Sequence, residues 1–249
     1  MLDIDKVISE IKTSLDNQKP ILSEDQISRI YKIINPDIDD YIILGLRIAE
    51  IEKIARNAQN KFNPLFDEAK EIFKILANSN VEEYKFASFF FLNRYKKLFT
   101  NSIPEFFKTE FFPYCHTWST CDSSCIRVLG PFLAKKGNEQ LAKTTMNKWA
   151  QNESLWIKRA SIVILLKIIM VHKEFSERYV FHKVEEMLNF SNENYIEKGI
   201  GWLLKTCSKY NPDSIFDYLM KNKERLPRLI LRYASEKLSK EKRLLVLKK

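Results

Sequence analysis

Residues 155–167 read Leu-Trp-Ile-Lys-Arg-Ala-Ser-Ile-Val-Ile-Leu-Leu-Lys, a stretch that is apolar on nearly every side of a helix. Such a helix must be buried among other elements, so it predicts the centre of a helical fold. It nevertheless carries Arg159 and, two turns later on nearly the same side, Lys167. Because a buried guanidinium without a partner is very costly, Arg159 needs an anion. That anion is either Asp122 or one that arrives from outside, such as a phosphate.

Composition extends the helical interpretation to the whole chain. The 249 residues include only 5 Gly and 8 Pro, which disfavours sheets joined by tight turns. Apolar periodicity and helix-start residues such as Ser23 and Pro212 indicate helices throughout, and no convincing alternating strand occurs. The fold class is therefore predicted to be all-α. The expected helices span 3–16, 24–34, 47–58, 62–77, 81–99, 102–112, 118–134, 138–150, 154–171, 175–188, 192–210, 213–220, 225–238 and 240–248.

The expected helices fall into consecutive pairs. Successive second helices are separated by roughly 33 to 39 residues, a step typical of helical-hairpin solenoids such as HEAT repeats. Stacked pairs form a superhelical solenoid whose concave face is lined by the second helices. We therefore expect one domain, residues 1–249, with a concave groove. The second helices are expected to begin near Val81, Trp118, Ser154, Asn192 and Arg225.

The charge of the chain is positive and unevenly distributed. Net charge is +9, with 14 Lys and Arg against 7 Asp and Glu in residues 191–249, and 8 against 11 in residues 1–60. A field of one sign on one side steers a polyanion toward the protein, so nucleic acid is the expected partner and the groove is expected to be basic. The alternative is the ordinary lysine-rich composition of proteins from AT-rich genomes.

Several classes of protein find no support in the sequence. No run of about 18 uncharged apolar residues occurs, so no membrane span is expected. The acidic, amphipathic start of the chain lacks the features of a secretory signal, and a cytoplasmic location is expected. There is no phosphate-binding glycine loop, no HExxH motif and no Ser-His-Asp set, which leaves kinases, NTPases and serine hydrolases without a basis.

The stretch 116–125, His-Thr-Trp-Ser-Thr-Cys-Asp-Ser-Ser-Cys, contains the first candidate site residues. Trp118 and Asp122 are four residues apart, so a helix would present an aromatic ring and an anion side by side. The cysteines form no CxxC pair, and we expect them to be buried small hydrophobic residues, with a metal site as the alternative. No metal or cofactor is predicted. The four cysteines are Cys115, Cys121, Cys125 and Cys207.

The stretch 195–210 contains the second group of candidates. Ile196, Ile200, Leu203 and Cys207 form its core face. Lys198, Trp202, Lys205 and Lys209 form a stripe on the other side. A ring set among lysines suits a polyanion that has flat parts, which means nucleic acid. The alternative is that Trp202 packs on a neighbouring repeat and the lysines are solvated. The residues expected to line one groove are Trp118, Asp122, Arg159, Lys167, Trp202, Arg225, Arg228 and Arg232.

Four segments together resemble the AlkD-like DNA alkylation repair family, which are HEAT-like-repeat DNA glycosylases. The segments are 44–50, 118–122, 156–167 and 198–212, and their order and spacing agree from about residue 41 to 238. The resemblance implies that Trp118 and Asp122 are the functional tryptophan and aspartate, Arg159 the groove arginine and Trp202 the second tryptophan. The DNA-contacting aromatic residue of the family's N-terminal helices is not assigned here, and the cysteines around Asp122 depart from the best-known members.

The resemblance implies a monomeric DNA glycosylase that excises cationic N3- or N7-alkylated purines from double-stranded DNA without full base flipping. Asp122 would stabilise an oxocarbenium-like transition state and orient the attacking water. The π faces of Trp118 and Trp202 would favour the cationic sugar or base edge. The residues expected to hold phosphates are Arg159, Lys167, Lys198, Lys205, Lys209, Arg228 and Arg232.

Two other functions stay open. One is a non-catalytic HEAT-like module that binds damaged or branched DNA, which would share the fold and the groove. Such a binder has no use for a carboxylate such as Asp122 facing a phosphate backbone. The other is a protein-interaction scaffold with an acidic partner, which predicts that the groove is not aligned with the tryptophans.

Overall fold

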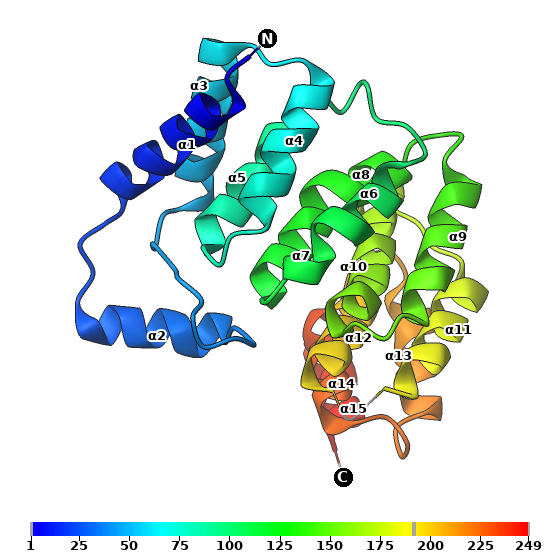
Figure 1. Cartoon of the computed structure of the whole chain (residues 1–249). Coiled ribbons are helices and arrows are strands. Elements are labelled where there is room, and N and C mark those ends of the chain that lie inside the picture. The colour runs from blue at the N-terminus through cyan, green and yellow to red at the C-terminus, as the bar shows by residue number, and fades with distance from the viewer. Residues whose placement is uncertain (1, 191–192, 249) are drawn as a thin grey trace. The chain divides into compact units, whose positions relative to one another are not determined.

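The structure, a computed structural model, describes residues 2–190 and 193–248 and is helical throughout them (Figure 1). The extended pairing found in these residues is limited to an isolated parallel bridge between Ile42 and Val81. The chain divides into two compact units, Met1–Leu129 and Gly130–Lys249. None of the described helices is long and apolar enough to cross a membrane. The all-α prediction is confirmed.

The helices of the first unit pack mainly around one central helix, α5 (Glu82–Asn93). α3 (Ile48–Phe62) and α7 (Trp118–Ser124) both pack on α5. α4 (Phe66–Ala77) also packs on α5, and α1 (Ile4–Gln18) packs on α3 and α4. The other elements of this unit are α2 (Glu24–Ile34), α6 (Ile103–Glu110), a 3-10 turn (Phe112–Tyr114) and a π-helical turn (Cys125–Leu129).

Phenylalanine side chains fill the centre of the first unit. The ring centroid of Phe73 lies 5.1 Å from that of Phe107, and the centroid of Phe89 lies 5.8 Å from that of Phe111. Aromatic pairs at such separations contribute about 0.5–1.5 kcal/mol beyond the burial of their area. Every residue of α5 except Asn93 is buried. The charged residues at the start of α5 are therefore held inside the unit together with the rings.

α2 differs from the other helices of the first unit because it does not pack into the core. It begins with a capping box, in which Gln26 N donates to Ser23 Oγ and Ser23 N donates to Gln26 Oε1. None of its residues is buried, although Ile27 and Ile33 lie on it. The helix stands apart from α1, α3 and α4 (Figure 1). Its position therefore depends on a few specific contacts and not on a packed core.

The second unit has the row of second helices that a solenoid requires. α9 (Glu139–Ala150) packs on α10 (Leu155–His172), α10 packs on α12 (Asn194–Cys207), and α12 packs on α14 (Arg228–Ala234). This stacking of consecutive hairpins is the arrangement of α-solenoid repeats. The other elements of this unit are α8 (Gly130–Leu133), α11 (Glu177–Leu188), α13 (Pro212–Lys221), a 3-10 turn (Ser235–Lys237) and α15 (Lys240–Leu247).

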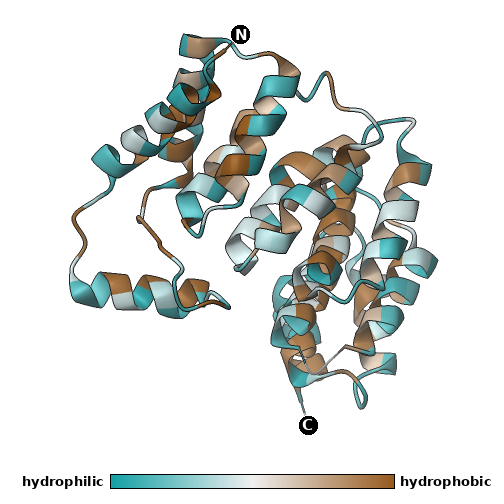
Figure 2. Cartoon of the chain, in the orientation of Figure 1, coloured by the Kyte–Doolittle hydropathy of each residue, from teal (hydrophilic) through white to brown (hydrophobic). Residues whose placement is uncertain are grey.

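α10 is the buried helix that the stretch 155–167 predicts, and its hydrophobic colouring is continuous along most of its length (Figure 2). α12 and α14 approach each other closely at Gly201. A Cβ atom at this position would lie 2.5 Å from the Cβ of Tyr233. Only glycine fits there, so this residue sets the spacing between the two helices.

Helix boundaries depart from expectation at several places. The helix expected over 81–99 ends at Asn93, the last residue of α5. The helix expected from residue 225 begins at Arg228, because Pro227 is its N-cap and a residue before proline avoids the helical conformation. The helix expected over 118–134 changes to a π-helical turn after Ser124. The start expected near Asn192 lies outside the described residues, and α12 is described from Asn194.

Candidate functional site

Trp118 and Asp122 lie one turn apart on α7, as the spacing predicts. The hydroxyl of Thr117 caps this helix by accepting from the backbone N–H of Thr120 at 3.2 Å. The indole Nε1 of Trp118 donates to the backbone carbonyl of Ile33 at 3.0 Å, and the ring is half-buried. Asp122 is 7 % exposed. The carboxylate therefore lies in a largely desolvated setting, where its charge acts more strongly than in water.

A π-helical turn over Cys125–Leu129 follows the end of α7, three residues after the candidate aspartate. Pro131 has no N–H for the carbonyl of Arg127, and its ring crowds that carbonyl. The Arg127 carbonyl instead accepts from Asn93 Nδ2 at 3.3 Å, which ties the widened turn to the end of α5. Single π-helical turns are common at functional sites because they re-aim side chains. In the sequence, the Gly-Pro pair that follows the turn could have indicated this departure from the α-helix.

Sequence reasoning missed a buried carboxylate beside the start of α7. Glu82, at the first position of α5, is 4 % exposed and accepts hydrogen bonds from the hydroxyls of Tyr41 and Thr117, the latter at 3.0 Å. Burial raises the pKa of Glu82 to about 7, and the hydrogen bonds from Tyr41, Ser119 and Thr117 oppose that rise. Burial also raises the pKa of Tyr41, and the neighbouring Glu82 charge raises it further. In the sequence, a carboxylate at the start of the Phe-rich stretch could have indicated this buried group.

Two more charged residues of α5 are held in the interior. Glu83 accepts from the backbone N–H groups of Leu44 and Gly45 at 2.9 and 2.7 Å, and so fixes the loop before α3. Gly45 has φ +88°, a conformation that favours glycine. Lys85 is fully buried and donates to the carbonyl of Ala77 at 2.9 Å. Burial lowers the pKa of Lys85 to about 8. Glu83 and Lys85 therefore stabilise α5 and its neighbours, the part of the first unit on which α7 packs.

Arg159 occupies the interior position in the second unit that the apolar stretch indicates. It is 4 % exposed, and its Nη1 donates to the backbone carbonyl of Tyr195 at the start of α12. A Cβ added at Gly199 would lie 3.5 Å from Nη1, which is an ordinary van der Waals contact, so the guanidinium packs against α12 at this residue. The guanidinium thus satisfies part of its hydrogen-bonding capacity with a carbonyl oxygen. Arg159 therefore also ties α10 to α12.

The predicted stripe on α12 is present in part. Trp202, Lys198 and Lys205 are half-buried on this helix. Lys209 is exposed but is not part of the helix, because α12 ends at Cys207 and not at residue 210 as expected. Lys198 Nζ lies 5.6 Å from the centroid of the Tyr195 ring, and Lys205 forms an ion pair with Glu236. Lys205 must leave this partner before it can bind a phosphate. Lys167 is half-buried, and Arg228 and Arg232 are exposed.

Arg225 differs from the other predicted arginines because it does not belong to α14. It precedes Pro227 and forms an ion pair with Glu185 of α11. It also donates to Asn222 Oδ1 through Nε at 3.0 Å. The expected stripe of Arg225, Arg228 and Arg232 on a single helix face is therefore reduced to the last two residues. Proline at the N-cap is the physical reason.

All four cysteines are buried, as predicted. Among the residues described by the structure, no group of three or more His, Cys, Asp and Glu side chains is arranged to hold a metal ion. Burial raises the pKa of Cys115 and Cys121. Thiols of this kind are unreactive, which agrees with a packing role.

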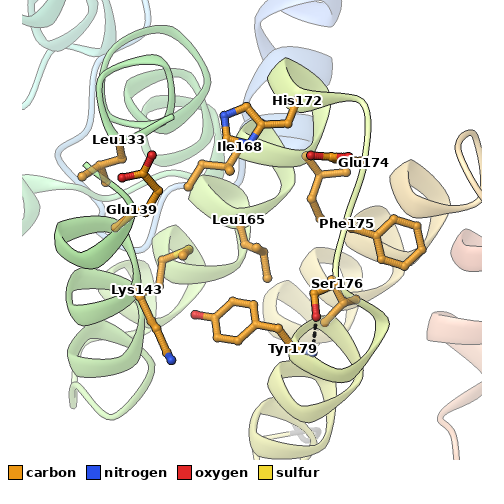
Figure 3. Close-up of a pocket in the computed structure, with 14 residues that line it drawn as sticks. Leu133, Glu139, Lys143, Leu165, Ile168, His172, Glu174, Phe175, Ser176 and Tyr179 are labelled. Carbon is orange, nitrogen blue, oxygen red and sulfur yellow. Dashed lines mark hydrogen bonds between the residues drawn. The ribbon is translucent and has the colours of Figure 1, made fainter. Parts of the chain in front are cut away.

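A cavity of about 610 Å³ lies in the second unit, between α9, α10 and α11 (Figure 3). Leu133, Met146 and Leu165 contribute to its apolar lining, and Glu139 and His172 lie at its edge. His172 Nε2 donates to the carbonyl of Ala134 at 2.8 Å, which ties the end of α10 to the end of α8. None of the predicted site residues lines this cavity.

Comparison with known proteins finds a matching family and a solved structure with a similar fold. A family model described as "DNA alkylation repair enzyme" matches residues 23–238. Among solved structures, the chain is similar to one described as "Predicted DNA alkylation repair enzyme from Enterococcus faecalis", with a TM-score of 0.68 and 16% sequence identity. The similarity covers 88% of this chain and 97% of that chain and, at this identity, concerns the fold alone. A search among curated proteins finds no match.

Proposed function

The chain belongs to the DNA alkylation repair enzyme family, and we propose that it is a DNA glycosylase that removes cationic N3- and N7-alkylated purines from duplex DNA. Family membership supports a role in the repair of alkylated DNA. The observation that carries the finer proposal is the pairing of Trp118 and Asp122 one turn apart on α7, inside the matched residues. A ring and a largely desolvated carboxylate are the groups that a developing sugar cation requires.

The proposed reaction needs little general-acid assistance. An alkylated purine already carries a positive charge, so it leaves as a neutral base when the bond between its nitrogen and C1′ breaks. The sugar becomes oxocarbenium-like, water adds at C1′, and the water proton passes to Asp122 or to solvent. Asp122 stabilises the sugar charge and orients the water, an effect worth on the order of 1 to 4 kcal/mol. The π face of Trp118 favours the same positive charge.

The basic residues of the second unit are proposed to bind the DNA backbone. Arginines and lysines carried by α10, α12 and α14, together with Lys209 after α12, would contact phosphates without reading sequence, which suits an enzyme that must recognise damage in any context. Lys205 would exchange Glu236 for a phosphate. The residues proposed for this role are Arg159, Lys167, Lys198, Lys205, Lys209, Arg228 and Arg232.

The direct test is incubation of the purified protein with N-methylated duplex DNA, followed by chromatographic and mass-spectrometric identification of the free bases. We expect release of 7-methylguanine well above the spontaneous rate measured without protein. Unmethylated duplex DNA is the substrate control and should release nothing. Release at only the spontaneous rate would reject the glycosylase proposal.

One observation favours the non-catalytic alternative, a module that binds damaged or branched DNA. Asp122 is only 7 % exposed, and a buried carboxylate is what a purely structural aspartate would also show. The two functions differ in the same experiment. The module binds methylated or branched duplex DNA in a salt-dependent manner and releases no base. The enzyme binds the DNA and also releases the alkylated base.

A further inference from the structure

The carboxylate of Glu82 connects two separate segments to the start of α7. Tyr41, in the loop after α2, donates to Glu82 Oε2 through its hydroxyl. Thr117, the N-cap of α7, donates to the same oxygen at 3.0 Å. Glu82 itself belongs to α5, in which every residue but the last is buried. The first turn of α7 is therefore tied to a helix that is buried along almost its whole length.

The hydroxyl of Thr117 depends on this carboxylate. A threonine hydroxyl has one proton to donate and two lone pairs that accept. Thr117 Oγ1 accepts from Thr120 N at 3.2 Å and lies 2.9 Å from Thr120 Oγ1. The Thr117 hydroxyl donates its proton to Glu82 and accepts from the backbone N–H of Thr120, and these two hydrogen bonds fix the direction of the cap.

We propose that Glu82 is a positioning residue for the candidate site: by holding the Thr117 hydroxyl it sets the rotation of α7, and thereby the direction in which Trp118 and Asp122 are presented. This inference rests on the proposed glycosylase function for its catalytic consequence, but its structural part does not. Glu82 acts through Thr117 and touches no substrate.

Burial of a carboxylate at this point has a cost, which agrees with a positioning role. Burial raises the pKa of Glu82 to about 7, so ionised Glu82 destabilises the folded chain relative to a neutral side chain. A neutral or apolar residue at the first position of a Phe-rich helix would pack without that cost. Hydroxyl donors from Tyr41 and Thr117 are gathered around this one group, whereas Glu83 beside it serves the loop at residues 44–46.

The test uses variants that remove single hydrogen-bonding groups. Glu82→Gln replaces one acceptor oxygen by an NH₂ group, and Tyr41→Phe removes one of the donors should the first variant fold poorly. Thr117→Val removes the capping hydroxyl at nearly constant volume, and Thr117→Ser restores it. Tyr84→Phe is the matched control, because Tyr84 also lies on α5 and donates to a carboxylate at 3.0 Å, but this carboxylate, Asp16, belongs to α1.

The structural measurement is the indole N–H signal of Trp118 in a proton–nitrogen NMR spectrum, assigned with the Trp118→Phe variant. We expect Glu82→Gln, Tyr41→Phe and Thr117→Val to shift this signal and to speed its hydrogen exchange, and Thr117→Ser and Tyr84→Phe to leave it near its original position. A Trp118 signal that moves no more in Glu82→Gln and Tyr41→Phe than in Tyr84→Phe would overturn the inference.

The catalytic measurement is 7-methylguanine release under single-turnover conditions. We expect Glu82→Gln to lower the rate about 10- to 100-fold, the effect of a small displacement of a catalytic group, with the Kd for duplex DNA nearly unchanged. A rate equal to that of the Tyr84→Phe control would also overturn the inference. If the unaltered protein releases no base, the proposed function fails, and the Trp118 signal still decides whether Glu82 positions α7.

Discussion

The indole nitrogen of Trp118 donates a 3.0 Å hydrogen bond to the backbone carbonyl oxygen of Ile33, which links α7 to the last turn of α2. The final carbonyls of a helix have no partner within the helix, so this bond satisfies one of them. His116 and Asp37 strengthen the link, because His116 Nδ1 lies 2.7 Å from Asp37 Oδ1 and Asp37 N donates to His116 O at 3.1 Å. A helix without buried residues is thus fastened to the helix that carries the candidate aspartate.

Trp118→Phe should loosen α2 without unfolding the first unit. The substitution removes the indole donor and keeps most of the apolar ring, so the loss is about 1 kcal/mol for one hydrogen bond. Because α2 has no buried core of its own, that loss should appear as faster amide exchange over residues 24–34. Hydrogen–deuterium exchange with mass spectrometry measures it, and Trp202→Phe serves as the control. Equal exchange of α2 in both variants would show that the bond does not hold the helix.

Asp122→Asn should separate catalysis from binding. The amide has nearly the same shape but no charge, so it cannot stabilise a positive sugar. We expect release of 7-methylguanine to fall about 100- to 1000-fold, while the Kd for methylated duplex DNA changes little. Asp217→Asn, on an exposed position of α13, is the control and should keep full activity. Unchanged release by the Asp122 variant would remove this residue from the mechanism.

Arg159→Ala should weaken DNA binding and reduce its dependence on salt. Loss of one phosphate contact lowers the slope of log K against log salt by about 1. Arg159 also donates to the carbonyl of Tyr195, so circular dichroism must first show that the variant is folded. Arg159→Lys should keep most of the slope, and Arg178→Ala on the exposed face of α11 should keep all of it. The same slope in Arg159→Ala as in the unaltered protein would argue against a phosphate contact.

Glu82→Gln should change how the free energy of unfolding depends on pH. The folded pKa of Glu82 is about 7 and lies above the usual value of 4.5 that applies to the unfolded chain. The unaltered protein therefore loses stability relative to the variant as pH rises from 4.5 to 7, and the difference is constant above that range. The expected change is on the order of 3 kcal/mol. Urea denaturation of both proteins at several pH values measures it, and a difference independent of pH would refute the raised pKa.

Local residue order alone was sufficient for the fold class and for most helices. The stretch 155–167 is apolar on all sides, and α10 is buried accordingly. Ser23 is the N-cap of α2, as expected of a helix-start residue. These features depend on contacts within about one helical turn, so periodicity and capping residues reveal them. The same is true of the i,i+4 pairing of Trp118 and Asp122.

The sequence alone did not predict the interactions between residues that lie far apart in the chain. Tyr41, Glu82 and Thr117 are separated by up to 76 residues and meet around one carboxylate only because α5 is buried and α7 packs on it. The ion pair of Lys205 with Glu236 likewise joins residues 31 positions apart, and it involves a lysine that the periodicity placed in a stripe suited to nucleic acid. Spacing determines which side chains share a face of one helix. Which partners they meet, and how burial then alters their pKa, depends on the packing of helices that the local pattern does not encode.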